Sequence, residues 1–440
     1  YGSIFLVVFL ALMGLVIGQK NLQELRSDQE YARVIAEAGL DYYKWFLAHN
    51  PNDVTNGTGA PGRYVHEFLA PDGTVLGEYS LEVRANEVCD TVMSIDIEST
   101  GYTIDNPDVT RTLSGRYARP TVAEYSYIIN DNVWAGADRD IIGPYHSNGL
   151  IRMDGTNNSL VTSGQDTWTC DNSELNCDPP YPTGDTLDAI FGVGPNTDLW
   201  QTSVPPIDFT GITLDLSAME SSALAAGRHW GPSGARGYRI NFRGTGNTFD
   251  LYRVNSTVSD HIITSETSLG TYSIPTDCPL IFVEDKLWLE GVVDTRVSVA
   301  AARVGESFDP DIILIDNLTY ASDDGGVLAV AENDVSIGID VPSVMEINGI
   351  FVAQQGNFGR DLYYGTHRCK DELTINGTIV SSGRVGTKWV GAGCSSSDGP
   401  YESGFAERVN AYDRKLVENP PPLAPETSDT YRFIEWRDDE

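Results

Sequence analysis

The sequence is poor in basic residues. Its 440 residues include 29 lysines and arginines against 63 aspartates and glutamates, which gives a formal net charge of −34 at pH 7. A chain with this charge repels phosphate groups, so binding to nucleic acid or to anionic headgroups is excluded as its function. Hydrophobic residues make up 41% and aromatic residues 10% of the chain. That is enough to build sizeable cores, which excludes general disorder.

Cysteine and histidine are both scarce, with six residues of each. No closely spaced C-x₂₋₄-C pair occurs, which excludes the usual structural zinc sites. Six thiols without metal spacing predict up to three disulfides in an oxidising compartment, and reduced cysteines in a cytosolic protein are the alternative. Two pairs are suggested by their positions and the third by elimination: Cys170–Cys177, Cys369–Cys394 and Cys89–Cys278.

Catalytic motifs are also missing. The chain has no G-x-S-x-G elbow and no H-E-x-x-H pair, and its one glycine-rich run, GTGNTF, does not fit a nucleotide-binding unit. His146, in GPYHSNG, is interpreted as a structural turn residue. We therefore expect no catalytic residue, no enzyme activity and no cofactor.

Two sets of residues are weaker candidates for ligands or modification. Aspartates in or beside adjacent turns could hold calcium, although a solvated acidic face is the favoured interpretation. These aspartates are Asp309, Asp311, Asp316, Asp323 and Asp324. The N-x-[ST] sequons are candidate glycosylation sites, and about this number would arise by chance. The sequons begin at Asn56, Asn157, Asn255, Asn317 and Asn376.

The first eighteen residues carry no charge. As a helix they would span about 27 Å, close to the thickness of a bilayer core. From Leu22 an amphipathic period continues to a stop at His49-Asn50-Pro51, so we expect one helix over residues 1–50. A signal peptide would need a basic front and a cleavage site, and neither is found. A membrane anchor and packing against copies of the same helix both remain.

Gly14-Leu-Val-Ile-Gly18 is a G-x-x-x-G motif, which lets helix backbones approach closely and favours packing between copies. The residues expected to pack in a filament core or membrane are Tyr1, Ile4, Phe5, Leu6, Val7, Val8, Phe9, Leu10, Leu12, Met13, Gly14, Leu15, Val16, Ile17 and Gly18.

Four segments carry a resemblance to a known family. They are AEAGLDYYKWFL at 36–47, VCDTVMSIDIESTGYTIDNPDVTRTLSGRYARP at 88–120, IIGPYHSNGLI at 141–151 and AYDRKLVENPPPLAPE at 411–426. Together with the GS-plus-apolar start, they cover about a third of the chain. These segments, in this order along the chain, resemble those of bacterial type IV pilin-like proteins, most closely the large PilX-like group.

The resemblance implies a structural subunit of an extracellular, cell-surface filament, inserted in the inner membrane before assembly. Tyr1 would then be the N-terminus left when a prepilin peptidase removes a basic leader. One departure is Phe5, where most pilins carry a glutamate that aids docking, and minor or tip subunits often lack that glutamate.

The remaining residues indicate mostly strands. We expect antiparallel strands over 51–120 that pack on the helix, and a β-rich head over 121–420. Its short β runs, spaced near 12 to 22 residues, favour an irregular parallel β-solenoid over a sandwich or barrel. Residues 421–440 should form a proline-rich strap with a final strand. The predicted fold class is α+β.

The function expected from these features is self-association into a helical filament through the apolar helix, with the head exposed. One alternative is a minor or tip subunit, an adhesin that binds a surface or glycan ligand through the head. The other is a membrane-anchored β-helix enzyme acting on polysaccharide. Nothing in the residues decides between adhesion, motility and display.

Overall fold

The structure is a computed structural model that describes residues 2–171, 175–177, 181–212, 215–258, 262–397 and 399–439. Strands hold 48% of the residues and helices 15%. The predicted α+β class is therefore wrong, and the fold is mostly β. Among the described residues, only α1 (Gly2–His49) exceeds ten helical residues, while strands recur from Arg63 to Asp439. The long helical period of the sequence is confined to the chain's first ninth, and most of the remaining elements are strands.

The chain forms two compact units. Unit 1 comprises residues 1–87, 92–119 and 428–440. Unit 2 comprises residues 88–91 and 120–427.

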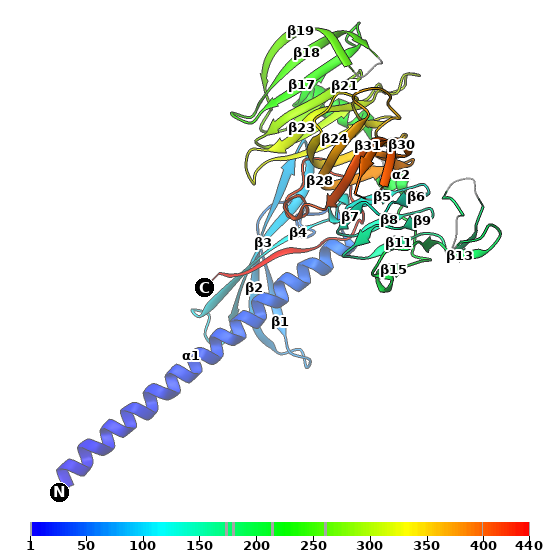
Figure 1. Cartoon of the computed structure of the whole chain (residues 1–440). Coiled ribbons are helices and arrows are strands. Elements are labelled where there is room, and N and C mark those ends of the chain that lie inside the picture. The colour runs from blue at the N-terminus through cyan, green and yellow to red at the C-terminus, as the bar shows by residue number, and fades with distance from the viewer. Residues whose placement is uncertain are drawn as a thin grey trace. The chain divides into compact units, whose positions relative to one another are not determined.

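Unit 1 consists of α1 and a five-stranded sheet in the order β1-β2-β3-β4-β32. The strands are β1 (Arg63–Leu69), β2 (Val75–Val88), β3 (Thr91–Thr103), β4 (Thr110–Ala118) and β32 (Arg432–Asp439). The β1–β2, β3–β4 and β4–β32 pairs are antiparallel. Figure 1 shows the C-terminal half of α1 lying along this sheet, while its N-terminal half continues beyond the strands.

The core of unit 1 forms where the second half of α1 meets the sheet. Apolar residues on one face of the helix, among them Ile35, Leu40 and Tyr43, are at most 1% exposed and pack on the inward side chains of β2 to β4. The buried hydroxyl of Tyr117 donates a 2.6 Å hydrogen bond to the Leu40 carbonyl oxygen. This apolar stripe explains why the helix is ordered against the sheet.

Two glycines allow the close approach of helix and sheet. A Cβ atom on Gly101 of β3 would lie 2.3 Å from the Ala32 carbonyl oxygen and 2.5 Å from the Ala36 nitrogen. A Cβ atom on Gly39 of α1 would lie 2.2 Å from the Ser99 hydroxyl oxygen. These glycines belong to the AEAG and ESTG stretches of the sequence, so both stretches serve one helix–sheet contact.

Unit 2 contains the remaining elements, most of them in one 22-stranded sheet. Its first strands are β5 (Tyr127–Ile129), β6 (Val133–Ala135), β7 (Arg139–Ile142), β8 (Tyr145–Ser147), β9 (Ile151–Met153), β10 (Thr156–Asn157), β11 (Val161–Ser163), β12 (Thr167–Thr169), β13 (Thr186–Asp188), β14 (Ile190–Phe191) and β15 (Trp200–Gln201). They are followed by β16 (Arg228–Trp230), β17 (Gly237–Arg243), β18 (Thr248–Val258), β19 (Ile262–Ser273), β20 (Leu280–Val283), β21 (Leu287–Val293), β22 (Arg296–Ala301) and β23 (Ile312–Tyr320). The last are β24 (Gly326–Ala331), β25 (Val335–Ile337), β26 (Val344–Ala353), β27 (Phe358–Gly359), β28 (Cys369–Ser381), β29 (Val385–Gly386), β30 (Lys388–Ser396) and β31 (Gly399–Ala411). The short helices are α2 (Phe209–Ile212), α3 (Leu216–Ala225) and α4 (Arg414–Glu418).

Parallel pairing in register builds the core of unit 2. Strands β20, β22, β24, β26, β28, β5, β8 and β11 pair in parallel, each with the next. One inward residue of each strand forms a continuous row, at most 1% exposed: Ile281, Val299, Ala329, Phe351, Ile379, Tyr127, Tyr145 and Val161. The same sheet also contains antiparallel members, including β17–β18–β19 and β30–β31. The expected solenoid is not confirmed.

Candidate functional site

The N-terminal half of α1 exposes large apolar side chains. Tyr1 lies outside the described residues, as do the side chains of Ile4, Phe5, Val7 and Val8. The described members of the predicted packing set are all exposed: Leu6 60%, Phe9 48%, Leu10 59%, Leu12 55%, Met13 50%, Leu15 64%, Val16 63% and Ile17 57%. Gly14 and Gly18 have no atom within 4 Å of where a Cβ would stand. Unit 1 therefore leaves this stretch uncovered.

No described helix combines the length and the apolar character needed to cross a membrane. The expected transmembrane helix over residues 1–18 is therefore not supported.

The cysteines form disulfides, which confirms that prediction. Cys89 pairs with Cys278, Cys170 with Cys177, and Cys369 with Cys394. The Cys89–Cys278 disulfide joins residues 189 positions apart. It links the β2–β3 turn, residues 88–91, to the rest of unit 2, to which that turn belongs.

The five sequon asparagines lie in different environments. Asn157 is 2% exposed, and its side-chain amide donates to the Ser159 carbonyl oxygen, so the folded chain has no room there for a glycan. Asn317 is exposed, and Asn56, Asn255 and Asn376 are half-buried.

The candidate calcium ligands do not converge. The Asp311 carboxylate accepts a hydrogen bond from Asn333 and pairs with Lys286 at 3.2 Å, and Asp323 pairs with Lys415. Asp309, Asp316 and Asp324 are exposed. Within the described ranges, the one group of ligand atoms close enough to share an ion is Glu220, His229 and Glu284.

That trio comes from α3, β16 and the residue after β20, and its three ligand atoms lie within 4.8 Å of one another. His229 Nε2 is 2.9 Å from Glu284 Oε1 and 3.7 Å from Glu220 Oε1. Two carboxylates and one imidazole, all half-buried, could hold a divalent cation such as zinc. No local sequence pattern marks this trio, because its members stand up to 64 positions apart in the chain.

The other candidate site is a pocket of about 620 Å³ in unit 2. One wall follows three short parallel strands, because β25 pairs with β27 and β27 pairs with β29 in register. The residues that directly precede these strands, Asp334, Asn357 and Arg384, all line the pocket. Because these strands pair in register, the three polar residues occupy equivalent positions on successive strands. Neighbouring strands of a sheet lie about 4.8 Å apart.

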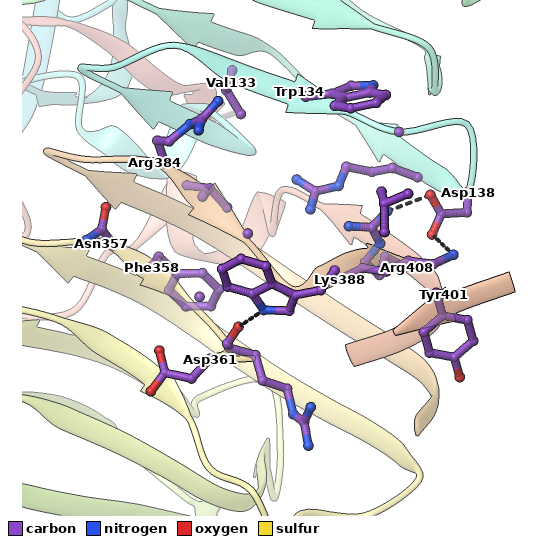
Figure 2. A pocket seen from close by; sticks show the side chains of 18 of the residues that line it. Val133, Trp134, Asp138, Asn357, Phe358, Asp361, Arg384, Lys388, Tyr401 and Arg408 are labelled. Carbon is purple, nitrogen blue, oxygen red and sulfur yellow. Dashed lines mark hydrogen bonds and ion pairs between the residues drawn. The ribbon is translucent and has the colours of Figure 1, made fainter. Parts of the chain in front are cut away.

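Aromatic side chains form further parts of the lining. Trp389 is 44% exposed, and its indole nitrogen donates a 2.8 Å hydrogen bond to the Arg360 carbonyl oxygen. Trp134 donates to Asp154 at 2.7 Å. Figure 2 shows Trp134 and Arg384 above the pocket, with Phe358 and Asp361 below. These hydrogen bonds hold both indole rings in fixed positions. The Arg152 guanidinium lies 4.2 Å from the Trp134 ring centroid, so Trp389 is the indole with more exposed surface.

Asp138, Lys388 and Arg408 form a buried ion cluster at one side of the pocket (Figure 2). The Asp138 carboxylate accepts from Lys388 at 2.7 Å and from Arg408 at 2.5 Å. Burial opposes ionisation of Asp138, but the charges of Arg408 and Lys388 outweigh it and lower its pKa. Burial, with the charge of nearby Arg139, lowers the pKa of Arg408 to about 10. The Asp138 carboxylate therefore forms ion pairs with two cations, Lys388 and Arg408.

The pKa of Asp334 shifts in the opposite direction to that of Asp138. Burial raises its pKa, and the carboxylates of Asp311 and Asp361 add to that effect, although the Asn357 backbone N–H donates to it at 2.6 Å. The pocket therefore holds a carboxyl group that protonates more readily than an ordinary aspartate.

Sequence reasoning did not find this pocket. Asp334, Asn357 and Arg384 are 23 and 27 positions apart, so no fixed repeat marks them. Each precedes a short apolar–small pair (Val-Ser, Phe-Gly, Val-Gly), and that recurring pattern was the available signal. His146, which the sequence analysis interpreted as structural, is 2% exposed and bonds to Thr162 and Asn148 at 2.9 Å each.

No protein-family model and no curated protein matches the chain. Among solved structures, the chain is similar to the competence-associated pilin ComZ from Thermus thermophilus. The alignment covers 94% of this chain and 98% of that chain at 13% sequence identity, with a TM-score of 0.31. A TM-score of this size does not show that the two chains share a fold.

Proposed function

We propose that the chain is a structural subunit of an extracellular type IV pilus-like filament, in which the N-terminal halves of α1 from many copies pack together. The observation that carries the proposal is the run of exposed apolar side chains from Leu6 to Ile17. The resemblance of the sequence segments to pilin-like proteins supports it, and so do three disulfides, which suit an oxidising exterior. A catalytic role is not part of the proposal.

Burial against neighbouring helices would stabilise such a filament. Covering the exposed part of one half-exposed large apolar side chain contributes about 1 kcal/mol. Seven described side chains in this stretch are at least 50% exposed, namely Leu6, Leu10, Leu12, Met13, Leu15, Val16 and Ile17. Their combined burial would be worth several kcal/mol per subunit, shared among its neighbours.

The apolar half of α1 also offers room for a neighbouring helix. Gly14 and Gly18 have open space around them, so a second helix could come close at this point.

The proposal is tested by electron microscopy of the purified full chain beside a variant that lacks residues 1–20. The full chain should form filaments, and the shortened chain should stay monomeric because it has lost the apolar surface. Filaments from the shortened chain would contradict the packing proposal.

A point variant makes the test sharper. Gly14→Leu adds bulk where the single chain has open space, and leucine favours a helix more than glycine does. Assembly should fall while the fold is kept. Gly62→Leu is the matched control, because Gly62 also has no atom within 4 Å of its Cβ position but lies away from α1's apolar half.

A minor or tip subunit is the second candidate, favoured by the pocket in unit 2. The share of this chain in purified filaments separates the two, since a main subunit must be the predominant band.

A further inference from the structure

The pocket in unit 2 has a charge opposite to that of the rest of the chain. Its lining contains five cationic side chains, Arg139, Arg360, Arg384, Lys388 and Arg408. It contains three carboxylates, Asp138, Asp334 and Asp361. The lining therefore has an excess of two positive charges in a chain whose net charge is −34. A cationic recess in an acidic surface attracts and orients an anion.

Two of these cations form no ion pair with any described residue. Arg139 donates to the Tyr127 and Thr387 hydroxyls and Arg360 to backbone carbonyls and the Ser403 hydroxyl, whereas Arg408 pairs with Asp138. Arg139 and Arg360 are each 2% exposed and Arg408 is 7% exposed. In the described part of the chain, the Nε atoms of all three are buried without a hydrogen-bond partner. The positive charges of Arg139 and Arg360, which no described carboxylate pairs with, favour an anionic group in the adjoining pocket.

The rest of the lining suits a polar ring compound. The ladder of Asp334, Asn357 and Arg384 places acceptors and donors at equivalent positions of three successive strands along one wall. Trp389 offers an exposed indole face whose position is fixed by its hydrogen bond to the Arg360 carbonyl oxygen. An aromatic face packs on the C–H face of a sugar ring while the polar ladder bonds its hydroxyl groups.

One glycine of the lining leaves space for such a ligand. Gly386 follows Val385 on β29, the strand that pairs with β27. A Cβ atom on Gly386 would meet no atom within 4 Å, so the position opens into free space. Larger residues here would fill the pocket.

We propose that this pocket binds an acidic oligosaccharide, with its carboxylate or sulfate groups toward the cationic end and its sugar rings against Trp389 and the polar ladder. A neutral saccharide would leave the excess positive charge unmet. This binding goes beyond filament assembly and does not depend on it, because every lining residue belongs to unit 2.

The test is calorimetric titration of the full chain, before assembly, with three hexasaccharides. The probes are a galacturonic acid oligomer, a sulfated heparin fragment and neutral maltohexaose. At least one acidic probe should bind, with an affinity that falls as salt rises, and maltohexaose should not bind. The two acidic probes distinguish carboxylate from sulfate recognition.

Variants assign the binding to the pocket. Gly386→Phe should weaken binding at least tenfold by filling the space, and Gly231→Phe is the matched control because Gly231 in unit 2 is equally open but does not line the pocket. Trp389→Ala should cost about tenfold through lost ring contact. Arg384→Gln should weaken binding and reduce its salt dependence. It also serves as the second test if Gly386→Phe does not fold.

Three results would overturn the inference. One is the absence of binding by both acidic probes at millimolar concentration. Another is equal binding of maltohexaose, and the last is binding that neither Gly386→Phe nor Arg384→Gln changes. Filament formation is measured separately, so failure here would leave the proposed function standing.

Discussion

Adding one methyl group at Gly101 should loosen the contact between α1 and the sheet. In Gly101→Ala, the new Cβ would stand 2.3 Å from the Ala32 carbonyl oxygen and 2.5 Å from the Ala36 nitrogen. Ordinary carbon–oxygen contacts exceed 3 Å, so the helix must move away by roughly 1 Å. Both obstructing atoms are helix backbone, which cannot turn aside as a side chain could. Overpacking of this kind costs about 1–3 kcal/mol.

Hydrogen exchange followed by mass spectrometry measures this loss locally. Amides in the docked half of α1, residues 32–47, should exchange about 5 to 150 times faster in Gly101→Ala. Gly62→Ala is the control, because nothing lies within 4 Å of its Cβ position, and its exchange should stay unchanged.

Gly39→Ala should give a smaller effect than Gly101→Ala. Its obstructing atoms, the Ser99 hydroxyl and a Tyr79 ring carbon, belong to side chains that can shift. Ser99→Ala should partly rescue it, because the hydroxyl oxygen 2.2 Å away is removed. Exchange in Gly101→Ala within twofold of the parent chain would refute the reasoning, since it would mean that the helix does not rest on this glycine.

Three further predictions concern other parts of the molecule. Asp138→Asn leaves Lys388 and Arg408 buried with too little negative charge, so unit 2 should lose about 3–5 kcal/mol in urea unfolding near pH 7. Because folding lowers the pKa of Asp138, its contribution is present above an aspartate's ordinary pKa and is lost as the pH falls through the lowered value, so the variant and parent should converge in strong acid. Cys278→Ser opens the loop of 189 residues and should cost about 5 kcal/mol by chain entropy, more than Cys177→Ser, whose loop spans 7 residues, and thermal unfolding of both variants checks the order. Raising salt from about 0.05 M to about 0.5 M should increase filament yield in sedimentation assays, because it screens repulsion between acidic subunits, and a fall in yield would count against helix packing as the driving force.

The sequence predicts the parts of this molecule whose signal is local. The 3.6-residue period after Leu22 indicates a long helix, and α1 covers Gly2–His49. Alternation in GEYSLEVRA and TVMSIDIEST indicates strands, and both stretches lie in β2 and β3. The predicted fold class was wrong because the one long helix has a clear sequence period. Many of the strands have only two to four residues, and each of these is too short to show a period.

The site depends on what the sequence does not show. Asp334, Asn357 and Arg384 become neighbours only through the register of β25, β27 and β29, and the unequal lengths of the segments between these strands hide that register. The partners of Asp138 lie 250 and 270 positions away. Burial of Asn157 likewise follows from tertiary packing, which an N-x-[ST] pattern cannot report.

The Cys89–Cys278 bond has a mechanical consequence. The chain passes between the two units at four places, after residues 87, 91, 119 and 427. If α1 were held in a filament while a ligand pulled on unit 2, the tension would be shared among these four chain connections and would not act on a single linker. Hydrogen-bonded strands can be peeled apart by force, but a cross-link at Cys89 would keep the β2–β3 turn from being drawn out of unit 2. A reducing medium should therefore lower the force at which a single subunit extends.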